Sequence, residues 1–188
     1  SVEAVRWYRL SAQQGFAAAQ CNLGICYELG DGVRKDVSEA MKWYKLAAAQ
    51  GNCTAQYNLG LCYESGAGIK HNQSESLKYY KLAALQGHAT AQYKLGTYYF
   101  NESENLELLE EEAFYWLQKS VNQGNAPAHC QLGLCYERGI GVEIDLQQAI
   151  RLYRLGSDKA DAAALYHLAH CYYTGLGIDK NEKIAVEF

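Results

Sequence analysis

Proline and long apolar runs are both scarce in this sequence of 188 residues. Pro127 is its single proline, and no Ser/Gly-rich or low-complexity run divides the chain, so no linker or internal domain boundary is predicted. No apolar run approaches the roughly 20 residues that cross a bilayer, and the sequence shows no charged-then-apolar leader. We therefore expect a soluble body without membrane insertion, and a fragment whose targeting segments lie elsewhere.

Basic residues do not outnumber acidic ones. The chain has 17 Lys and Arg against 21 Asp and Glu. A nucleic-acid binder needs a basic stripe that displaces counterions from phosphates, and no such stripe stands out, so no nucleic-acid partner is expected. Six of the acids form one short tract without a Lys or Arg: Glu102, Glu104, Glu107, Glu110, Glu111 and Glu112.

The chain consists almost entirely of one unit of about 36 residues, written repeatedly. An alanine marks the same slot of each copy and is followed four residues later by leucine: Ala19, Ala55, Ala91, Ala128 and Ala164. Self-similarity at such a period is the signature of a stacked array. We expect a single array over 1–188, divided into a half-repeat 1–15, repeats 16–51, 52–87, 88–124 and 125–160, and a truncated repeat 161–188.

Each unit predicts two helices. In the first helix, Leu23 and Tyr27 follow helical spacing and belong to one core-facing side. Gly30 and Gly32 then supply the positive φ that a chain reversal requires. Asp36 is predicted to cap the second helix. The sequence therefore predicts an all-α fold, and the same features recur as Gly66/Gly68, Gly139/Gly141, Gly175/Gly177, Asn72, Asp145 and Asn181.

A glycine stands in the middle of the first helix in four units, at Gly24, Gly60, Gly96 and Gly133. Each costs about 1 kcal/mol relative to alanine. Four such sites would take a large share of a typical net stability of about 5 to 15 kcal/mol, so a close approach of another helix is predicted there. The fifth unit has Ala169, the next smallest side chain, in this slot.

The ordered pattern Ala-x-x-x-Leu-Gly-x-x-Tyr, Gly-x-Gly, Asp/Asn, Ala-x-x-x-Tyr, Ala-Ala-x-x-Gly resembles the Sel1-like repeat, a relative of the tetratricopeptide repeat. It covers the chain from Glu3 to Phe188. The resemblance implies a right-handed α-solenoid that acts as an adaptor and gathers other proteins into complexes, with no catalytic residue shared across the family. The fold by itself does not fix a function.

The third unit departs from this pattern. One residue is added between Tyr99 and Ala113, and Glu102 takes the place of the first loop glycine, so we expect a longer and more exposed loop. Acids near a helix N-terminus are favoured by its dipole, and a solvated turn is one interpretation. The other is a contact with a basic partner, which added salt would weaken, through Glu102, Glu104, Glu107 and Glu110.

The side of the first helix opposite its core leucine, here called the first-helix face, is predicted to line the concave surface by analogy with tetratricopeptide repeats. A solvated helix face would be rich in Lys and Glu, whereas this one carries Tyr, Leu and Phe. Tyrosine recurs at interface hot spots. The residues predicted to bind a partner polypeptide are Tyr57, Leu61, Glu64, Tyr93, Thr97, Phe100, Leu134, Glu137, Tyr166, His170 and Tyr173.

Burial between repeats is the alternative for part of this face. Four residues lie near the expected seams and are equally consistent with ordinary core: Cys21, Ile25, Leu61 and Leu134. If the face is open, replacing Tyr93 and Phe100 with Ala should weaken partner binding and leave melting nearly unchanged. If melting falls sharply, those rings belong to the core.

The seven cysteines all lie in or at the start of first helices. Some Sel1-like proteins from oxidising compartments join the two helices of a unit by a disulfide, and no second helix here carries a cysteine. Equivalent cysteines sit on stacked helices about 10 Å apart, beyond the roughly 7 Å Cα limit for a bridge. We expect buried thiols at Cys26, Cys62, Cys135 and Cys171, and a reducing, cytoplasmic location.

Neither a metal site nor a cofactor site is predicted. His167, His170 and Cys171 lie close on one helix, but no Cys-x-x-Cys or His-x-x-x-His spacing is present. The Gly-x-Gly loops follow helices and lack the Lys-Ser/Thr of a phosphate-binding loop. No enzymatic activity is expected.

The leading functional prediction is a non-catalytic protein–protein interaction scaffold that binds a partner polypeptide along the concave face. The alternative is an assembly subunit that forms a homo-oligomer, or joins a larger complex, through its end repeats. Aromatic residues at the two ends favour this alternative, because solenoids without polar caps tend to pair: Trp7, Tyr8 and Phe188.

Overall fold

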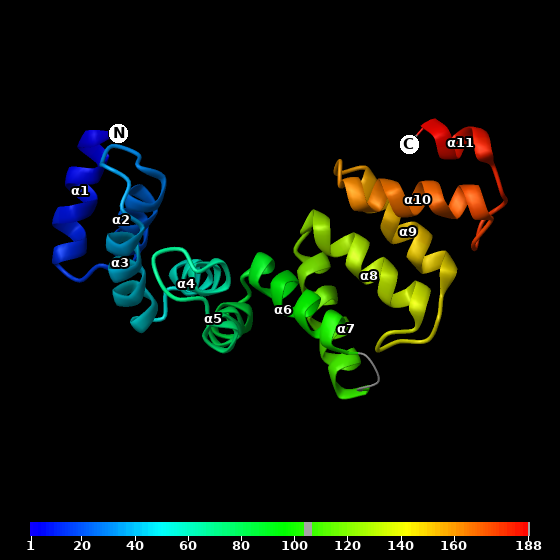
Figure 1. Cartoon of the computed structure of the whole chain (residues 1–188), viewed down its shortest axis with the longest axis horizontal. Helices are drawn as coiled ribbons and strands as arrows, with labels where there is room; N and C mark the ends of the chain where they lie inside the picture. Colours follow the sequence, from blue (N-terminus) through cyan, green and yellow to red (C-terminus); the bar gives the residue numbers. More distant parts are fainter. Residues whose placement is uncertain (104–106, 188) are drawn as a thin grey trace. The chain divides into compact units, whose positions relative to one another are not determined.

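The computed structural model describes residues 1–103 and 107–187 and is built of helices (Figure 1). About 75% of the chain is helical, and the described residues include no strand. The predicted all-α solenoid class is confirmed. The helices are α1 (Val2–Gln13), α2 (Ala17–Leu29), α3 (Val37–Ala49), α4 (Cys53–Ser65), α5 (Gln73–Leu85), α6 (Ala89–Glu102), α7 (Glu107–Asn122), α8 (Ala126–Arg138), α9 (Leu146–Ser157), α10 (Ala162–Thr174) and α11 (Glu182–Glu187).

Successive helices pack as hairpins that are stacked in sequence order. The most extensive contacts join the two helices of one repeat, α2 with α3, α4 with α5 and α8 with α9. Contacts of α3 with α4 and of α9 with α10 join each repeat to the next. A first helix such as α4 therefore packs both on its own second helix and on that of the preceding repeat.

The chain forms two compact units, Ser1–Ala91 and Gln92–Phe188, and the division falls inside α6. The core of the first unit surrounds Tyr44 and Leu59 between α2, α3 and α4. A core of the second unit surrounds Tyr153 and Leu168 between α8, α9 and α10. The repeat pattern runs through the division, and the prediction of one array without an internal boundary stays a prediction.

Two glycines fix the turn between the helices of every repeat except the third. Gly66 ends α4 with φ 73°, and its N–H donates to the carbonyl of Cys62. Gly68, with φ 72°, lies against the start of the preceding second helix, where an added Cβ would come within 3.0 Å of the Val37 side chain and 3.3 Å of its carbonyl. The first glycine therefore caps a helix, and the second lets the loop contact the neighbouring repeat.

The predicted helix caps and close contacts are confirmed. Side-chain oxygens accept hydrogen bonds from backbone N–H groups three residues on at Asp36, Asn72, Asp145 and Asn181. An added Cβ at Gly60 would lie 2.5 Å from the Tyr80 ring, and one at Gly24 would lie 2.6 Å from Tyr44. The mid-helix glycines are thus the places where a core side chain of the second helix rests on the first, a tyrosine at Gly24, Gly60 and Gly133 and Leu117 at Gly96.

The predicted greater length of the loop in the third repeat is wrong, while its predicted exposure falls on residues 104–106, which lie outside the described residues. In the sibling repeats the segment between the two helices runs over 30–36, 66–72 and 139–145, whereas α6 ends at Glu102 and α7 begins at Glu107. The helices are longer instead, so that α6 has 14 residues and α7 has 16, against 13 for both α4 and α5. Leu, Glu and Ala after residue 106 are good helix formers, which explains why α7 begins early.

Candidate partner-binding surface

The seams between repeats bury part of the first-helix face. Leu134 is only 6% exposed and Cys21 only 3%, and Cys21 packs in the core between α2, α3 and α4. Ile25 and Leu61 are half-buried. Leu134 therefore offers almost no surface to a partner, although it belongs to the predicted set.

Three of the predicted aromatic anchors are also half-buried. Tyr57 stacks on His88 with ring centroids 4.5 Å apart and lies 5.8 Å from the Tyr80 ring. Tyr93 and Phe100 pack against the core cluster of Leu117, Leu132, Cys135 and Leu152. The Arg138 guanidinium lies 5.9 Å from the centroid of the Phe100 ring, within the range of a cation–π contact.

Polar members of the face have internal roles. The Tyr80 hydroxyl donates to Glu64 at 2.9 Å, and the Tyr153 hydroxyl donates to Glu137 at 2.7 Å. The half-buried Thr97 has a buried hydroxyl with no hydrogen-bond partner among the described residues. The two carboxylates thus satisfy core tyrosines, and burial with this hydrogen bond raises the pKa of both Tyr80 and Tyr153 well above its usual range.

The tyrosine–glutamate pairs were missed by the sequence analysis. The partners are 16 residues apart on different helices, so no local pattern joins them. The third repeat carries the signal that could have found them, because both positions change together: Phe100 replaces the glutamate, and Leu117 replaces the tyrosine over Gly96. Exchanging both partners of a buried hydrogen bond for apolar groups avoids an unsatisfied polar group.

An open part of the face lies on α10. Tyr166 is 67% exposed and Tyr173 is 59% exposed, and His170 between them is exposed as well. Their spacing of four and three residues puts them on one side of the helix. The Tyr166 and His170 rings stack with centroids 6.5 Å apart, and the Lys180 ammonium lies 5.6 Å from the centroid of the Tyr173 ring.

The acidic tract belongs largely to helix ends. Glu102 is exposed at the end of α6, Glu107 and Glu110 lie in the first turn of α7, and Glu104 lies outside the described residues. Glu112 accepts a hydrogen bond of 2.7 Å from the Trp116 indole N–H. Docking of a basic partner by this tract stays a prediction.

The cysteines are free thiols, and six of the seven are buried. Burial raises the pKa of Cys62 and Cys171 to about 11 and that of Cys135 to about 12. Thiols of this kind are poor nucleophiles at neutral pH. The prediction that Cys26, Cys62, Cys135 and Cys171 act as buried apolar side chains is confirmed.

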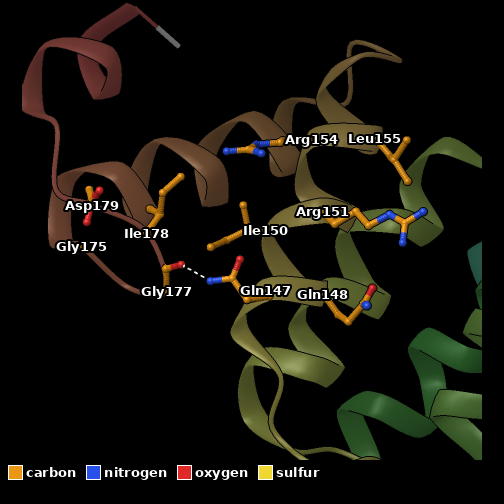
Figure 2. A pocket seen from close by; sticks show the side chains of 10 residues that line it. All are labelled: Gln147, Gln148, Ile150, Arg151, Arg154, Leu155, Gly175, Gly177, Ile178 and Asp179. Atoms are coloured by element: carbon orange, nitrogen blue, oxygen red, sulfur yellow. Dashed lines mark hydrogen bonds between the residues drawn. The ribbon is translucent and has the colours of Figure 1, made fainter.

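A groove of about 1000 Å³ lies between α9 and the turn from α10 to α11 (Figure 2). Ile150 and Ile178 give it apolar walls, while Arg151 and Arg154 stand on the α9 side. The Gln147 amide donates to the carbonyl of Gly177 at 2.7 Å, the contact dashed in Figure 2. The groove was not predicted from the sequence, because its walls come from a second helix and from the turn of the next repeat.

The residues described by the structure include no group of three or more His, Cys, Asp or Glu side chains placed to hold a metal ion. Among those residues, too, every helix is too short or too polar to cross a membrane. The predicted absence of catalysis, metal and cofactor stays a prediction.

Stacked helical hairpins with glycine-capped turns define the class of protein: an α-solenoid built from short repeats. The sequence matches the Sel1 repeat over residues 1–16, 17–52, 54–88, 89–125, 126–161 and 162–188, and the chain belongs to the Sel1 repeat family.

Two solved structures share this fold closely. A Sel1 repeat protein from Oxalobacter formigenes is 37% identical, with a TM-score of 0.86 over 93% of this chain and 69% of that one. A protective antigen with an SLR fold from uropathogenic Escherichia coli strains is 31% identical, with a TM-score of 0.87 over 97% of this chain and 39% of that one.

Curated relatives match a smaller part of the chain. Human protein sel-1 homolog 2 is 34% identical over 91 residues, which are 45% of this chain and 13% of that protein. Chitin synthase regulatory factor 2 of Schizosaccharomyces pombe is 34% identical over 85 residues, which are 42% of this chain and 17% of that protein. The match thus spans less than a fifth of either relative.

Proposed function

We propose that this chain is a non-catalytic scaffold that binds a partner polypeptide on the first-helix face. Sel1 repeat proteins generally mediate protein–protein interaction. The observation that carries the proposal is the exposed side of α10, where Tyr166, His170 and Tyr173 stand together in solvent. Large, amphipathic rings of this kind supply much of the binding energy at protein interfaces.

Site-specific photo-crosslinking tests this proposal without a known partner. Benzoylphenylalanine placed at Tyr166 or at Tyr173 should form adducts with one or a few proteins when the chain is irradiated in its native cell extract. Tyr115 is the matched control, because it is 49% exposed on α7, outside the first-helix face. Adduct patterns that are the same at all three positions would contradict the proposal.

Self-association through the end repeats is a second candidate, supported by an exposed ring near the start of the described chain. Trp7 on α1 is 60% exposed, whereas its neighbour Tyr8 is half-buried. Phe188 lies outside the described residues. Sedimentation equilibrium over a wide range of concentrations separates the candidates, since a mass of one chain at every concentration would eliminate self-association.

We also propose that the protein resides in a reducing compartment such as the cytoplasm. Its support is the set of seven free thiols, six of which are buried. Proteins of oxidising compartments use cysteine mostly in disulfides. Detection of the tagged protein in a secreted or luminal fraction would contradict this assignment.

A further inference from the structure

The second helices of the first unit share a pattern of exposed residues that belong neither to the core nor to the turns. In the first unit, each second helix carries a basic residue, a second basic residue three positions on, and then a leucine. All nine side chains are exposed. We call them the basic–leucine stripe: Arg6, Arg9, Leu10, Lys42, Lys45, Leu46, Lys78, Lys81 and Leu82.

The leucines of the stripe remain in solvent in every repeat of the first unit. Leu10 is 44% exposed, Leu46 is 50% exposed and Leu82 is 41% exposed. Single exposed leucines are common on protein surfaces and need no explanation. An exposed leucine in the same slot of three consecutive second helices is instead a repeated feature, which follows the period of the repeat.

Of the four lysines beside Leu46 and Leu82, only two form ion pairs with the described residues. Lys42 pairs with Glu39 at 2.8 Å, and Lys78 pairs with Glu75 at 3.1 Å. Within residues 1–103 and 107–187, Lys45 has no ion-pair partner, and neither has Lys81. Each of these two repeats therefore presents one unpaired ammonium group next to one exposed leucine.

In the second unit one second helix, α9, carries the same pattern, whereas α7 has Tyr115, Gln118 and Lys119 in these slots. Arg151, Arg154 and Leu155 occupy the corresponding slots of α9, and all three line the groove of Figure 2 beside Ile150. Leu155 is 41% exposed, close to the value for Leu82. The pattern thus recurs once in the second unit, on α9, where it lines a groove together with Ile150 and Ile178.

We propose that the basic–leucine stripe binds an acidic segment of a partner protein, in which carboxylates alternate with apolar side chains. Carboxylates would pair with Lys45 and Lys81, and the apolar side chains would cover Leu46 and Leu82. Charge complementarity selects this occupant, because the stripe offers unpaired cations together with exposed apolar side chains. This surface is distinct from the first-helix face, so failure of either proposal leaves the other standing.

Nucleic acid and anionic membrane fit the stripe less well. Binding to phosphates gains strength from many cations in a row, and an anionic lipid surface likewise attracts clusters of about four to eight basic residues. Of the six basic residues in the stripe, Lys42 and Lys78 are paired with glutamate and Arg9 donates to the Tyr27 hydroxyl, which leaves three. The exposed leucines between the charges would also gain little from a phosphate backbone.

Fluorescence anisotropy with the full chain tests the proposal. The probe is a fluorescein-labelled peptide Glu-Leu-Glu-Glu-Leu-Leu-Glu-Glu, measured at low and at physiological salt. The double variant K45E/K81E should bind it about tenfold or more weakly than the parent protein. The matched control is K35E/K70E, which makes the same change of net charge at two exposed loop lysines and should stay within about twofold.

Further variants and peptides distinguish specific binding to the stripe from a general effect of net charge. The variant L46S/L82S should also weaken peptide binding, and a peptide with Gln for Glu should bind poorly to the parent protein. Equal weakening by K45E/K81E and K35E/K70E would overturn the proposal, as would no binding of the acidic peptide. Stripe-dependent binding of phosphatidylserine vesicles or duplex DNA in preference to the peptide would also overturn it.

Discussion

Ala160 shows how one residue can oppose the repeat pattern. Its φ is 59°, and it is the sole non-glycine residue with positive φ among those described. The equivalent slot in other units holds Gly15, Gly51, Gly87 and Gly124, with φ between 78° and 90°. The left-handed conformation costs an L-residue about 1 to 2 kcal/mol, so this turn is strained.

The change Ala160→Gly should therefore stabilise the protein. Relief of the left-handed strain outweighs the extra chain entropy of glycine, about 0.5 to 1 kcal/mol, and leaves a gain of about 0.5 to 1 kcal/mol. Urea unfolding monitored by circular dichroism measures this gain. The reverse change, Gly51→Ala, has open space around the new Cβ and should lose a similar amount. A neutral or destabilising Ala160→Gly would show that the turn carries no strain.

His88 sets the cap of one helix. Its Nδ1 accepts a hydrogen bond of 3.2 Å from the Ala91 N–H at the start of α6, while its ring stacks on Tyr57. The same cap is made by Asn52 and Asn125 at α4 and α8. A protonated imidazole cannot accept this hydrogen bond, and a cation at a helix N-terminus also opposes the helix dipole.

Stability should fall as the pH drops below about 6.5 because of this cap. Burial lowers the pKa of His88 below its ordinary value, which the unfolded chain retains near 6.5. The unfolded state therefore binds the proton first, so the stabilisation is complete above about pH 6.5 and is lost as the pH falls through the folded pKa. Unfolding free energies measured between pH 4 and pH 8 report this loss.

The variant His88→Asn is the matched control for the cap. Asparagine makes the same cap at α4, so this variant should keep its stability at neutral pH and lose part of the pH dependence. Burial also lowers the pKa of His167, which contributes in the same direction in both proteins and cancels in the comparison. Identical pH profiles for the parent and His88→Asn would contradict the role of the cap.

A second prediction concerns two half-buried rings of α6, in the third repeat. Tyr93 and Phe100 pack on the core cluster that contains Leu117 and Leu132, so the double change to Ala should lower the free energy of unfolding by about 3 kcal/mol or more. Thermal melting measures the effect. Tyr166→Ala with Tyr173→Ala is the control, because these exposed rings should leave melting nearly unchanged. Equal effects of the two pairs would show that burial does not distinguish them.

Across the whole molecule, the thiols should divide into one reactive and six protected groups. Cys53 is half-buried at the start of α4, whereas the other six cysteines are buried. Burial raises the pKa of Cys130 to about 12, which keeps its thiol protonated. Under native conditions at pH 8, Ellman's reagent should quickly titrate one thiol per chain, and Cys53→Ser should abolish that phase. Several fast thiols in the native protein would mean that the repeats open readily.

The sequence predicted those features that one repeat displays within a short stretch. Turn glycines, side-chain caps and the close approach at Gly60 all follow from residue type and helical spacing. Contacts between residues on different helices could not be predicted in this way. The bond between Tyr80 and Glu64 joins two helices, and the stripe through Lys45 and Leu46 emerges only when residues are compared by slot rather than along the chain.

The exposed residues of the first-helix face were the hardest to predict, because a tyrosine on a first helix can be core or surface depending on its neighbours. Tyr93 and Tyr166 occupy the same slot, yet Tyr93 packs on a core cluster while Tyr166 is 67% exposed. Spacing alone fixes the side of the helix on which each ring lies. The elements packed against that side decide how much of the ring reaches solvent.

The second turn glycine has a consequence for how such a chain can change over generations. Gly68 meets the main chain at Val37, and Gly141 meets the carbonyl of Glu110. The main-chain part of such a joint is the same whichever residue stands there, so one unit can follow another with few changes at the contact. Units can thereby be gained or lost while the exposed side chains of the remaining units stay as they are.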